Sequence, residues 1–177
     1  MDFAGLINGI PESFENVFYN KIIIMFKLQN VENRVALELL IEGYQFPDVA
    51  DDDWCLVRAV VTQGDDVFEV VDPALETTDI IRILDWFKCL AARKLPRSGK
   101  LSFIEPCLTF EFLACREDAV RISISLSHEM KPDFVMRQFG LKTSDWKVVF
   151  ELGNEQFNKI IADIEAVLQR CPVRDKE

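Results

Sequence analysis

The chain has 177 residues, 49% of them hydrophobic, with 14 Phe and 3 Trp but only 7 Gly and 7 Pro. That composition excludes a disordered or low-complexity chain and predicts one globular domain with a core of its own. The formal net charge is −10, from 30 acidic and 20 basic residues, and this excess of acid argues against direct contact with a nucleic-acid backbone.

The N-terminal segment shows no targeting or membrane-spanning signal. Asp2 stands where a signal peptide would carry basic residues, and the apolar run "IIIMF" is far shorter than a bilayer requires. Residues 1–24 are predicted to form an extension or a short helix, residues 25–172 a single domain, and residues 173–177 a tail. We expect a cytoplasmic location and no association with a membrane.

The first half of the domain has the pattern of strands. Alternating apolar residues predict a strand over 34–43, and Pro47 with the aspartates after it predicts a loop. Segment 54–63 is apolar on both faces, as in a central strand. The sequence "GDD" at 64–66 is typical of a hairpin turn, and it leads into a further strand at 67–72.

The second half holds two helices and the remaining strands. Apolar residues at helical spacing predict a helix that Thr77 or Thr78 caps and that fades near Leu95. A last helix begins with Asn154 as its cap. Alternation within the strand at 119–127 places Ser123 and its other serines toward solvent. The predicted strands of this half are 101–104, 107–114, 119–127 and 146–152.

This order of elements predicts an α+β fold. Strands that follow one another at hairpin spacing favour antiparallel pairing, and the two helices are separated by further strands. We therefore expect a mostly antiparallel sheet of about six or seven strands, with two main helices packed on one face.

Motifs for cofactor or metal chemistry are not found in the sequence. It has no glycine-rich phosphate loop, and "DVADDD" lacks the spacing, the central Gly and the terminal Glu of a calcium-binding EF-hand loop. The five cysteines form no CxxC pair, so reduced thiols are expected rather than disulfides or a zinc site. We therefore expect no cofactor and no metal.

Glu105 and Glu111 are the best candidates for a catalytic carboxylate pair, and His128 is the single histidine. Pro106 cannot donate to a strand ladder, so it interrupts the strand between the two glutamates. The alternative is structural: Glu105 and Pro106 form a corner at which Glu105 is buried and accepts hydrogen bonds, while Glu111 faces solvent. Because no base, nucleophile or metal motif supports catalysis, the structural interpretation is favoured and no enzyme is predicted.

The negative charge is concentrated between Glu42 and Asp79. This window holds eleven acids and one base, Arg58, so it carries the whole net charge of the chain. A solvated loop region is the ordinary explanation of such a run. The sharper explanation is a surface for a basic partner, whose association it would accelerate by roughly ten- to a thousandfold. The candidates for that surface are Asp48, Asp51, Asp52, Asp53, Asp65, Asp66, Glu69, Asp72 and Glu76.

Aromatic residues flank the first acidic loop. Tyr44, Phe46 and Trp54 are candidate anchors for a partner, since binding hot spots favour large aromatic side chains. The competing interpretation for Phe46 and Trp54 is that they pack in the core.

Four parts of the chain match one known sequence pattern. The strongest are the "YQFPD" loop followed by Trp54, and "LSFIEPCLTFEF" at 101–112. The others are "DPALETTDIIRILDWFKCLA" and the closing "WKVVFELGNEQFNKIIADIEAVLQRCP". Together they resemble the bacterial WapI-type immunity family over roughly residues 25–172, which leaves residues 1–24 as an extension.

The resemblance implies a small cytoplasmic protein without enzymatic activity. Its expected partner is the toxic C-terminal domain of a contact-dependent bacterial toxin, typically a nuclease with a basic active-site surface, which it binds and neutralises. An acidic inhibitor suits such a partner. The alternative is a structural or regulatory interaction module without a toxin partner, one that self-associates into a homo-oligomer.

Overall fold

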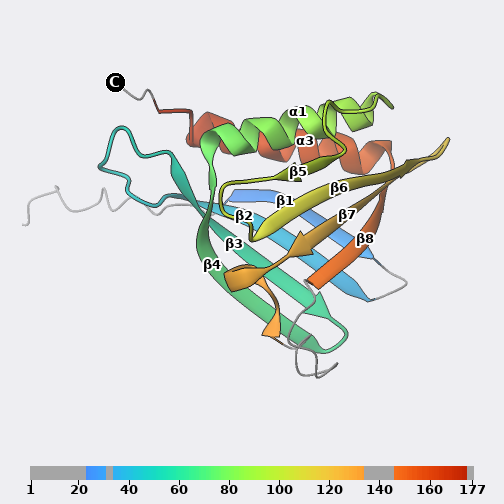
Figure 1. The fold of residues 1–177 in the computed structure, drawn as a ribbon, viewed down its shortest axis with the longest axis horizontal. Coiled ribbons are helices and arrows are strands. Elements are labelled where there is room, and N and C mark those ends of the chain that lie inside the picture. Colours follow the sequence, from blue (N-terminus) through green and yellow to red (C-terminus); the bar gives the residue numbers. More distant parts are fainter. Residues whose placement is uncertain (1–22, 31–33, 134–145, 175–177) are drawn as a thin grey trace, which may run out of the picture.

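The computed structural model describes residues 23–30, 34–133 and 146–174. Within them the chain forms two four-stranded antiparallel sheets and two main helices (Figure 1). The predicted α+β class is confirmed, with antiparallel strands and two main helices. One sheet of about six or seven strands was predicted, whereas the eight described strands divide into two sheets of four.

The first sheet has the order β1-β2-β3-β4. Alternate residues of its two central strands are buried, which is the pattern that predicts half-buried strands. A two-residue turn joins the third strand to the fourth, and Gly64 has the positive φ of 63° that this turn needs. The strands are β1 (Ile23–Asn30), β2 (Val35–Tyr44), β3 (Trp54–Gln63) and β4 (Asp66–Glu76).

β1 was not predicted, and a bulge in the strand explains why. The register with β2 shifts between Ile24 and Phe26, so that Met25 and Phe26 are both fully buried. A bulge breaks the alternation of inward and outward side chains on which strand prediction depends. The strand begins at Ile23, before the predicted start of the domain at Met25.

The second sheet has the order β5-β6-β7-β8. In this sheet β7 (Val120–Leu126) follows the predicted alternation except at Ser123, which is 1% exposed instead of facing solvent. The Ser123 hydroxyl donates to the Glu111 carboxylate at 3.3 Å, and that bond satisfies a buried polar group. The elements are β5 (Lys100–Ser102), β6 (Leu108–Cys115), β7 (Val120–Leu126), the short 3-10 helix η1 (His128–Met130) and β8 (Trp146–Leu152).

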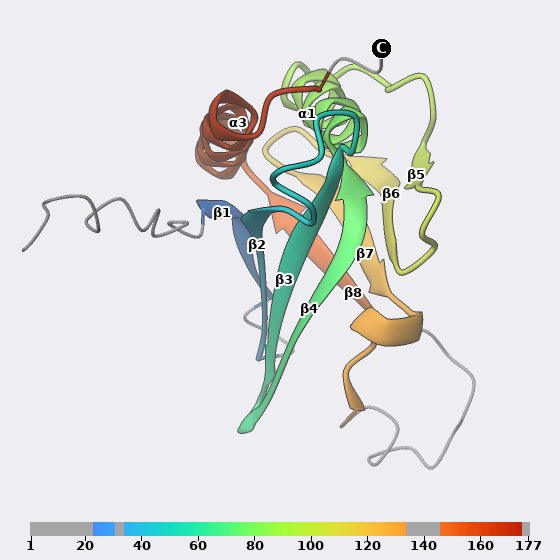
Figure 2. The ribbon, with the colours of Figure 1, turned by 90° about the vertical axis from the view of Figure 1, so that its left-hand side faces the viewer.

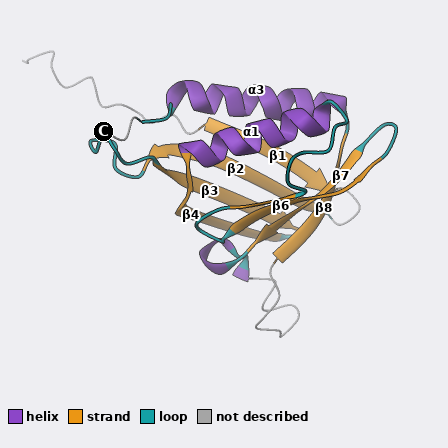
Figure 3. Cartoon of the chain, turned by 45° about the horizontal axis from the view of Figure 1, so that its top comes forward, coloured by secondary structure: helices purple, strands orange, loops and turns teal. Residues whose placement is uncertain are grey.

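The two helices, α1 (Thr77–Ala91) and α3 (Asn154–Arg170), lie side by side above the strands (Figure 3). α1 follows β4 directly, and α3 packs against both α1 and β1. No helix in the described part of the chain is both long and apolar enough to cross a bilayer.

The helix caps differ from the predicted ones by one residue. Glu76 precedes α1 instead of Thr77 or Thr78, and its backbone N–H donates to Asp79 Oδ2 at 3.3 Å. Gly153 precedes α3 instead of Asn154, and its N–H donates at 2.8 Å to the side chain of a glutamine three residues on. Both helices therefore use an N3 side chain to bind the free N–H of the residue before them.

The core lies between the two sheets and beneath the helices. Figure 2 shows the sheets diverging below α1 and α3 like two sides of a wedge. Phe110 of β6 is at the centre of an aromatic cluster. Its ring centroid lies 5.9 to 6.1 Å from those of Phe26, Trp86, Phe87 and Phe103. Phe26 lies in β1 of the first sheet, Trp86 and Phe87 lie in α1, and Phe103 and Phe110 lie in the second sheet or next to it. The cluster therefore joins the two sheets and the helix layer.

Candidate functional site

The acidic window does not form one surface. β3 separates the loop before it from the hairpin after it, and ten extended residues span roughly 30 Å. The predicted acids therefore fall into three places. The β2–β3 loop holds Asp48, Asp51, Asp52 and Asp53, the hairpin end holds Asp65, Asp66 and Glu69, and the far half of β4 holds Asp72 and Glu76.

The β2–β3 loop is built around Arg174, which follows α3. The guanidinium Nη1 donates to the carbonyl oxygens of Phe46 at 2.9 Å and Asp52 at 3.0 Å, and also to that of Val49. Its Nη2 donates to the carbonyl oxygen of Pro47 at 2.8 Å. Four carbonyls of one loop thus converge on one cation, so the shape of the loop depends on a residue more than a hundred positions away.

Tyr44 and Asp53 complete this arrangement. The backbone N–H of Arg174 donates to Asp53 Oδ1 at 2.8 Å, and the Arg174 guanidinium carbon lies 3.5 Å from the centroid of the Tyr44 ring. The Tyr44 hydroxyl donates to the Pro172 carbonyl, and burial raises the pKa of that hydroxyl. Asp53 is only 2% exposed. Its carboxylate therefore serves the loop and is not on the surface.

Part of the predicted surface at this loop is accessible. Asp48 and Asp51 are exposed, and Phe46 is 49% exposed, so Phe46 is not a core residue. Trp54 is half-buried, and its backbone N–H donates to Asp52 Oδ1 at 3.1 Å. Two carboxylates and one aromatic ring are thus presented at the tip of the loop.

Arg174→Met is expected to lower the free energy of unfolding by about 1–3 kcal/mol, because it leaves carbonyls of the loop without their charged donor. Urea unfolding measures this loss, and limited proteolysis reports whether the loop opens. Lys159→Met is the matched control, since among the described residues Lys159 pairs only with Asp163, one turn along the same helix. The control should lose less than about 0.5 kcal/mol. Equal losses for the two variants would contradict this account of the loop.

Part of the charge at the hairpin end is neutralised within the sheet. Arg58 of β3 forms ion pairs with Glu42 of β2 and Glu69 of β4. Arg34 lies 3.7 Å from Asp65, and both side chains are exposed. Asp66 is exposed and forms no ion pair with any described residue. The hairpin end therefore keeps a negative charge that is only partly compensated.

Carboxylates from three separate segments interact electrostatically at Asp72 of β4. They are Asp72 of β4, Glu105 of the bend before β6, and Glu129 of η1, which packs against β4. Burial raises the pKa of Asp72, and the negative charges of Glu129 and Glu105 raise it further. Burial and the same three carboxylates raise the pKa of the neighbouring Cys107 thiol to about 11. Asp72, Glu105 and Glu129 are called the carboxylate cluster below.

The bend at Glu105 and Pro106 is held by backbone carbonyls and not by the Glu105 side chain. Ser127 donates its hydroxyl to the Pro106 carbonyl at 2.6 Å and its backbone N–H to the Cys107 carbonyl at 2.9 Å. Glu105 is exposed, so the expectation of a buried, hydrogen-bonded glutamate is wrong. Its apolar neighbours suggested burial, but Ile104 is itself 72% exposed.

Asp72→Asn is expected to stabilise the protein at neutral pH. A carboxyl whose pKa is raised by folding favours its protonated form in the folded state, so its ionisation destabilises the fold as the pH rises from the ordinary pKa of Asp to the raised pKa, and the full loss remains above it. The parent protein therefore loses stability relative to the variant as the pH increases, and the two converge as the pH falls toward about 4. Thermal unfolding of both proteins between these limits tests the sign. A variant that is less stable at neutral pH would contradict it.

The catalytic candidates are not brought together. Glu111 lies on β6, where Lys147 donates to it at 2.6 Å and lowers the pKa of its carboxyl. Glu105 lies in the bend, and His128 is exposed at the start of η1. Within residues 23–30, 34–133 and 146–174, no three His, Cys, Asp or Glu side chains are grouped so that they could hold a metal ion.

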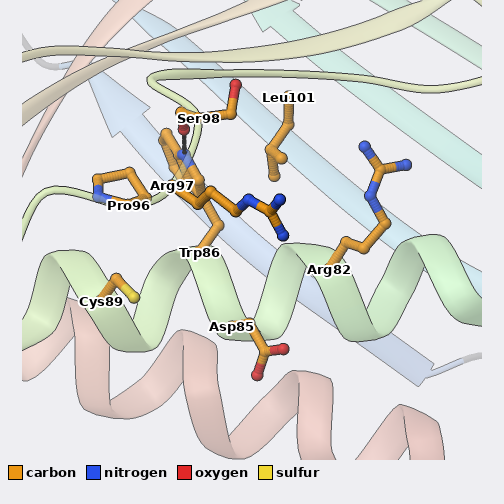
Figure 4. Close-up of a pocket in the computed structure, with 8 residues that line it drawn as sticks. All are labelled: Arg82, Asp85, Trp86, Cys89, Pro96, Arg97, Ser98 and Leu101. Carbon is orange, nitrogen blue, oxygen red and sulfur yellow. Dashed lines mark hydrogen bonds between the residues drawn. The ribbon is translucent and has the colours of Figure 1, made fainter.

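An open pocket of about 530 Å³ lies between α1 and the loop before β5 (Figure 4). Trp86, Pro96 and Leu101 form its apolar wall, and Figure 4 shows the guanidinium of Arg97 extending across it toward the side of Arg82. Segment 86–104 contains five bases and no acid. Asp85 also lines the pocket, and Arg82 is paired with Asp79 at 2.7 Å, so the pocket carries charges of both signs. None of the catalytic candidates lines it, nor the smaller pocket of about 90 Å³ beside Tyr44.

Arg174 and Glu129 are the site residues that the sequence did not reveal. Arg174 falls in a short tail after a helix and a proline, and Glu129 lies outside the acidic window. No local pattern marks either residue, because each acquires its role only through contacts with distant segments.

Comparison with known proteins identifies a family. The model of a family described as the immunity protein WapI-like family matches residues 27–172 of the chain. A search of curated proteins returns no match.

Proposed function

We propose, because the chain belongs to the WapI-like immunity protein family, that it binds and neutralises the toxic C-terminal domain of a contact-dependent bacterial toxin. Family membership gives the chain a toxin-immunity role. The proposal adds that the toxin domain is a nuclease with a basic active-site surface. It also adds that the chain acts by binding alone, without catalysing a reaction.

Charge is the first support for a basic partner. The chain carries a net charge of −10, and the surplus lies in the window from Glu42 to Asp79. A nuclease must attract a polyanion, so its active-site surface is positive. An inhibitor of opposite sign is steered toward that surface and competes there with the nucleic acid.

The carboxylate cluster is the observation that carries the proposal. The negative charges of Glu129 and Glu105 act on Asp72, and none of the three carboxylates has an ion pair with a described residue. Such a group costs stability in the isolated protein, and a cationic side chain of a partner would remove that cost. The exposed Ile104 beside Glu105 adds an apolar contact to this surface.

The acidic loop before β3 is a second contact region, on the same half of the β3–β4 pair as Asp72. Arg174 holds it in one shape before any partner binds, which lowers the entropy cost of association. Asp48, Asp51 and Phe46 are all exposed on this loop, which offers an aromatic anchor together with negative charge. Asp72 pairs with Val57, three residues along β3 from Trp54 at the end of the loop, so about 10 Å of strand separate the two regions and one partner domain can contact both.

Salt dependence of binding tests the proposal. Isothermal titration of the chain with its cognate toxin domain should show affinity that falls steadily as salt rises, because the Debye length shrinks from about 10 Å at 0.1 M to about 3 Å at 1 M. The toxin's activity should return as the complex dissociates. Tight binding that is indifferent to salt would contradict the electrostatic surface, and binding only to a second copy of the chain would favour a self-associating module.

A further inference from the structure

β4 is the outermost strand of the first sheet. It pairs with β3 on one side, and no described residue extends the sheet on its other side. The strand is 11 residues long. The open edge of a strand presents a row of backbone N–H and C=O groups to which another extended chain can bind.

The register of the hairpin shows which backbone groups face outward. Gln63 and Asp66 flank the two-residue turn and therefore form a hydrogen-bonded pair. Hydrogen-bonded and non-hydrogen-bonded pairs alternate from there along the two strands. The N–H and C=O groups of Val67, Glu69 and Val71 consequently point away from β3 and toward the open edge.

The side chains along this edge are accessible. Val67 is 67% exposed, Val71 is 38% exposed, and Glu69 between them is exposed as well. Pro73 lies opposite Leu56, which is the next outward position, and it has no N–H to offer. The open edge is therefore a short row centred on Glu69, matched to a partner strand of about five residues.

Charge determines which strand fits this edge. Residues 65–72 contain four acids and no base, and the carboxylate cluster lies at one end of the row. Arg34 and Arg58 offset only part of this charge. A second copy of the chain pairing through the same edge would place acids opposite acids, which is destabilising. A strand with lysine or arginine between apolar residues would instead form ion pairs along the row.

We infer that the outer edge of β4 binds an extended, basic segment of the toxin domain by strand addition. The backbone N–H and C=O groups of Val67, Glu69 and Val71 form hydrogen bonds with the added segment, and their side chains contact the neighbouring side chains of that segment. The acids of 65–72 favour a segment that carries lysine or arginine. The inference rests on the proposed function for the identity of the partner, whereas the open acidic edge is a property of this chain alone.

Hydrogen exchange with a model strand tests the edge itself. The probe is a blocked octapeptide of alternating Lys and Val at millimolar concentration, and the matched control is the same peptide with Glu in place of Lys. In the free protein the amides of Val67, Glu69 and Val71 should exchange rapidly. The Lys-Val peptide should slow all three about tenfold or more, and the Glu-Val peptide should not. No slowing, equal slowing by both peptides, or strong protection in the free protein would overturn the inference.

Two substitutions at Val71 separate backbone pairing from side-chain contact. Val71→Pro removes an outward N–H without removing a hydrogen bond to β3. The Lys-Val peptide should then no longer slow exchange of the Val67 and Glu69 amides. Val71→Thr keeps the N–H and the β-branched shape and should retain this protection. Equal protection in the two variants would overturn strand addition. If Val71→Pro does not fold, exchange in the parent protein still decides the matter.

The same amides distinguish the two proposals when the toxin domain is used. Protection of Val67, Glu69 and Val71 by the toxin domain supports both. A salt-sensitive complex that leaves these three amides exchanging as in the free protein supports the proposed function and overturns strand addition at this edge. Failure of any toxin domain to bind, with protection by the Lys-Val peptide intact, overturns the proposed function instead.

Discussion

Replacing the carboxylate cluster by amides, as Asp72→Asn, Glu105→Gln and Glu129→Gln together, is expected to slow association with the toxin domain about tenfold or more at low salt. Uncharged amides keep the size of the side chains but remove the field that steers a basic partner. The difference from the parent protein should shrink as salt rises and nearly vanish at about 1 M. Stopped-flow measurement of the association rate over a salt series checks both statements.

The matched control removes three charges elsewhere. Glu117, Asp118 and Glu155 are exposed, lie at the β6–β7 turn and the start of α3, and can be changed to Gln, Asn and Gln. If position matters, the control should associate at nearly the parent rate. Equal slowing in both triple variants would mean that net charge alone governs the encounter, and the carboxylate cluster would lose its assigned role. Unfolding curves should show that the carboxylate-cluster variant is at least as stable as the parent protein at neutral pH, because it contains Asp72→Asn.

Phe110→Ala is expected to destabilise the fold by about 3–5 kcal/mol, the largest effect of any single substitution considered. Phe110 is fully buried, and its ring touches four other aromatic rings from different layers. Removing it leaves a cavity that those layers must close together. For a chain of this length the melting temperature should fall by roughly 6–20 °C.

Leu113→Ala on the same strand is the control for Phe110. Leu113 is 41% exposed, so its truncation should change the free energy of unfolding by less than about 0.5 kcal/mol. Urea titration of both variants gives the comparison. A loss below about 1 kcal/mol for Phe110→Ala would show that the sheets and helices do not depend on a shared aromatic centre.

Periodicity predicted most elements of the fold because most strands are regular. β2 and β3 bury alternate residues without interruption until their ends, and both helices have one apolar stripe. β1 escaped prediction because its bulge places Met25 and Phe26 on the same side. The division into two sheets also escaped, since alternation shows which face of a strand is buried but not which strands are neighbours.

The candidate site was harder to predict because a count of charges in the sequence does not show where the side chains lie in the fold. The acidic window is continuous in sequence, yet β3 places its two loops at opposite ends of the sheet. The Asp53 carboxylate accepts a hydrogen bond from the backbone N–H of Arg174, and Glu105 comes near Asp72 only in the folded chain. Glu129, from outside the window, completes the cluster. Contacts between distant segments of this kind follow from tertiary packing, which no local pattern encodes.

Affinity capture from the source bacterium tests the central claim most directly. The tagged chain is used as bait at low salt, the column is eluted with a salt gradient, and the proteins released are identified by mass spectrometry. We predict recovery of the basic C-terminal domain of a surface toxin, eluting as the salt rises, with the carboxylate-cluster variant releasing it at lower salt. Recovery of the chain alone would contradict the claim and would identify a self-associating module.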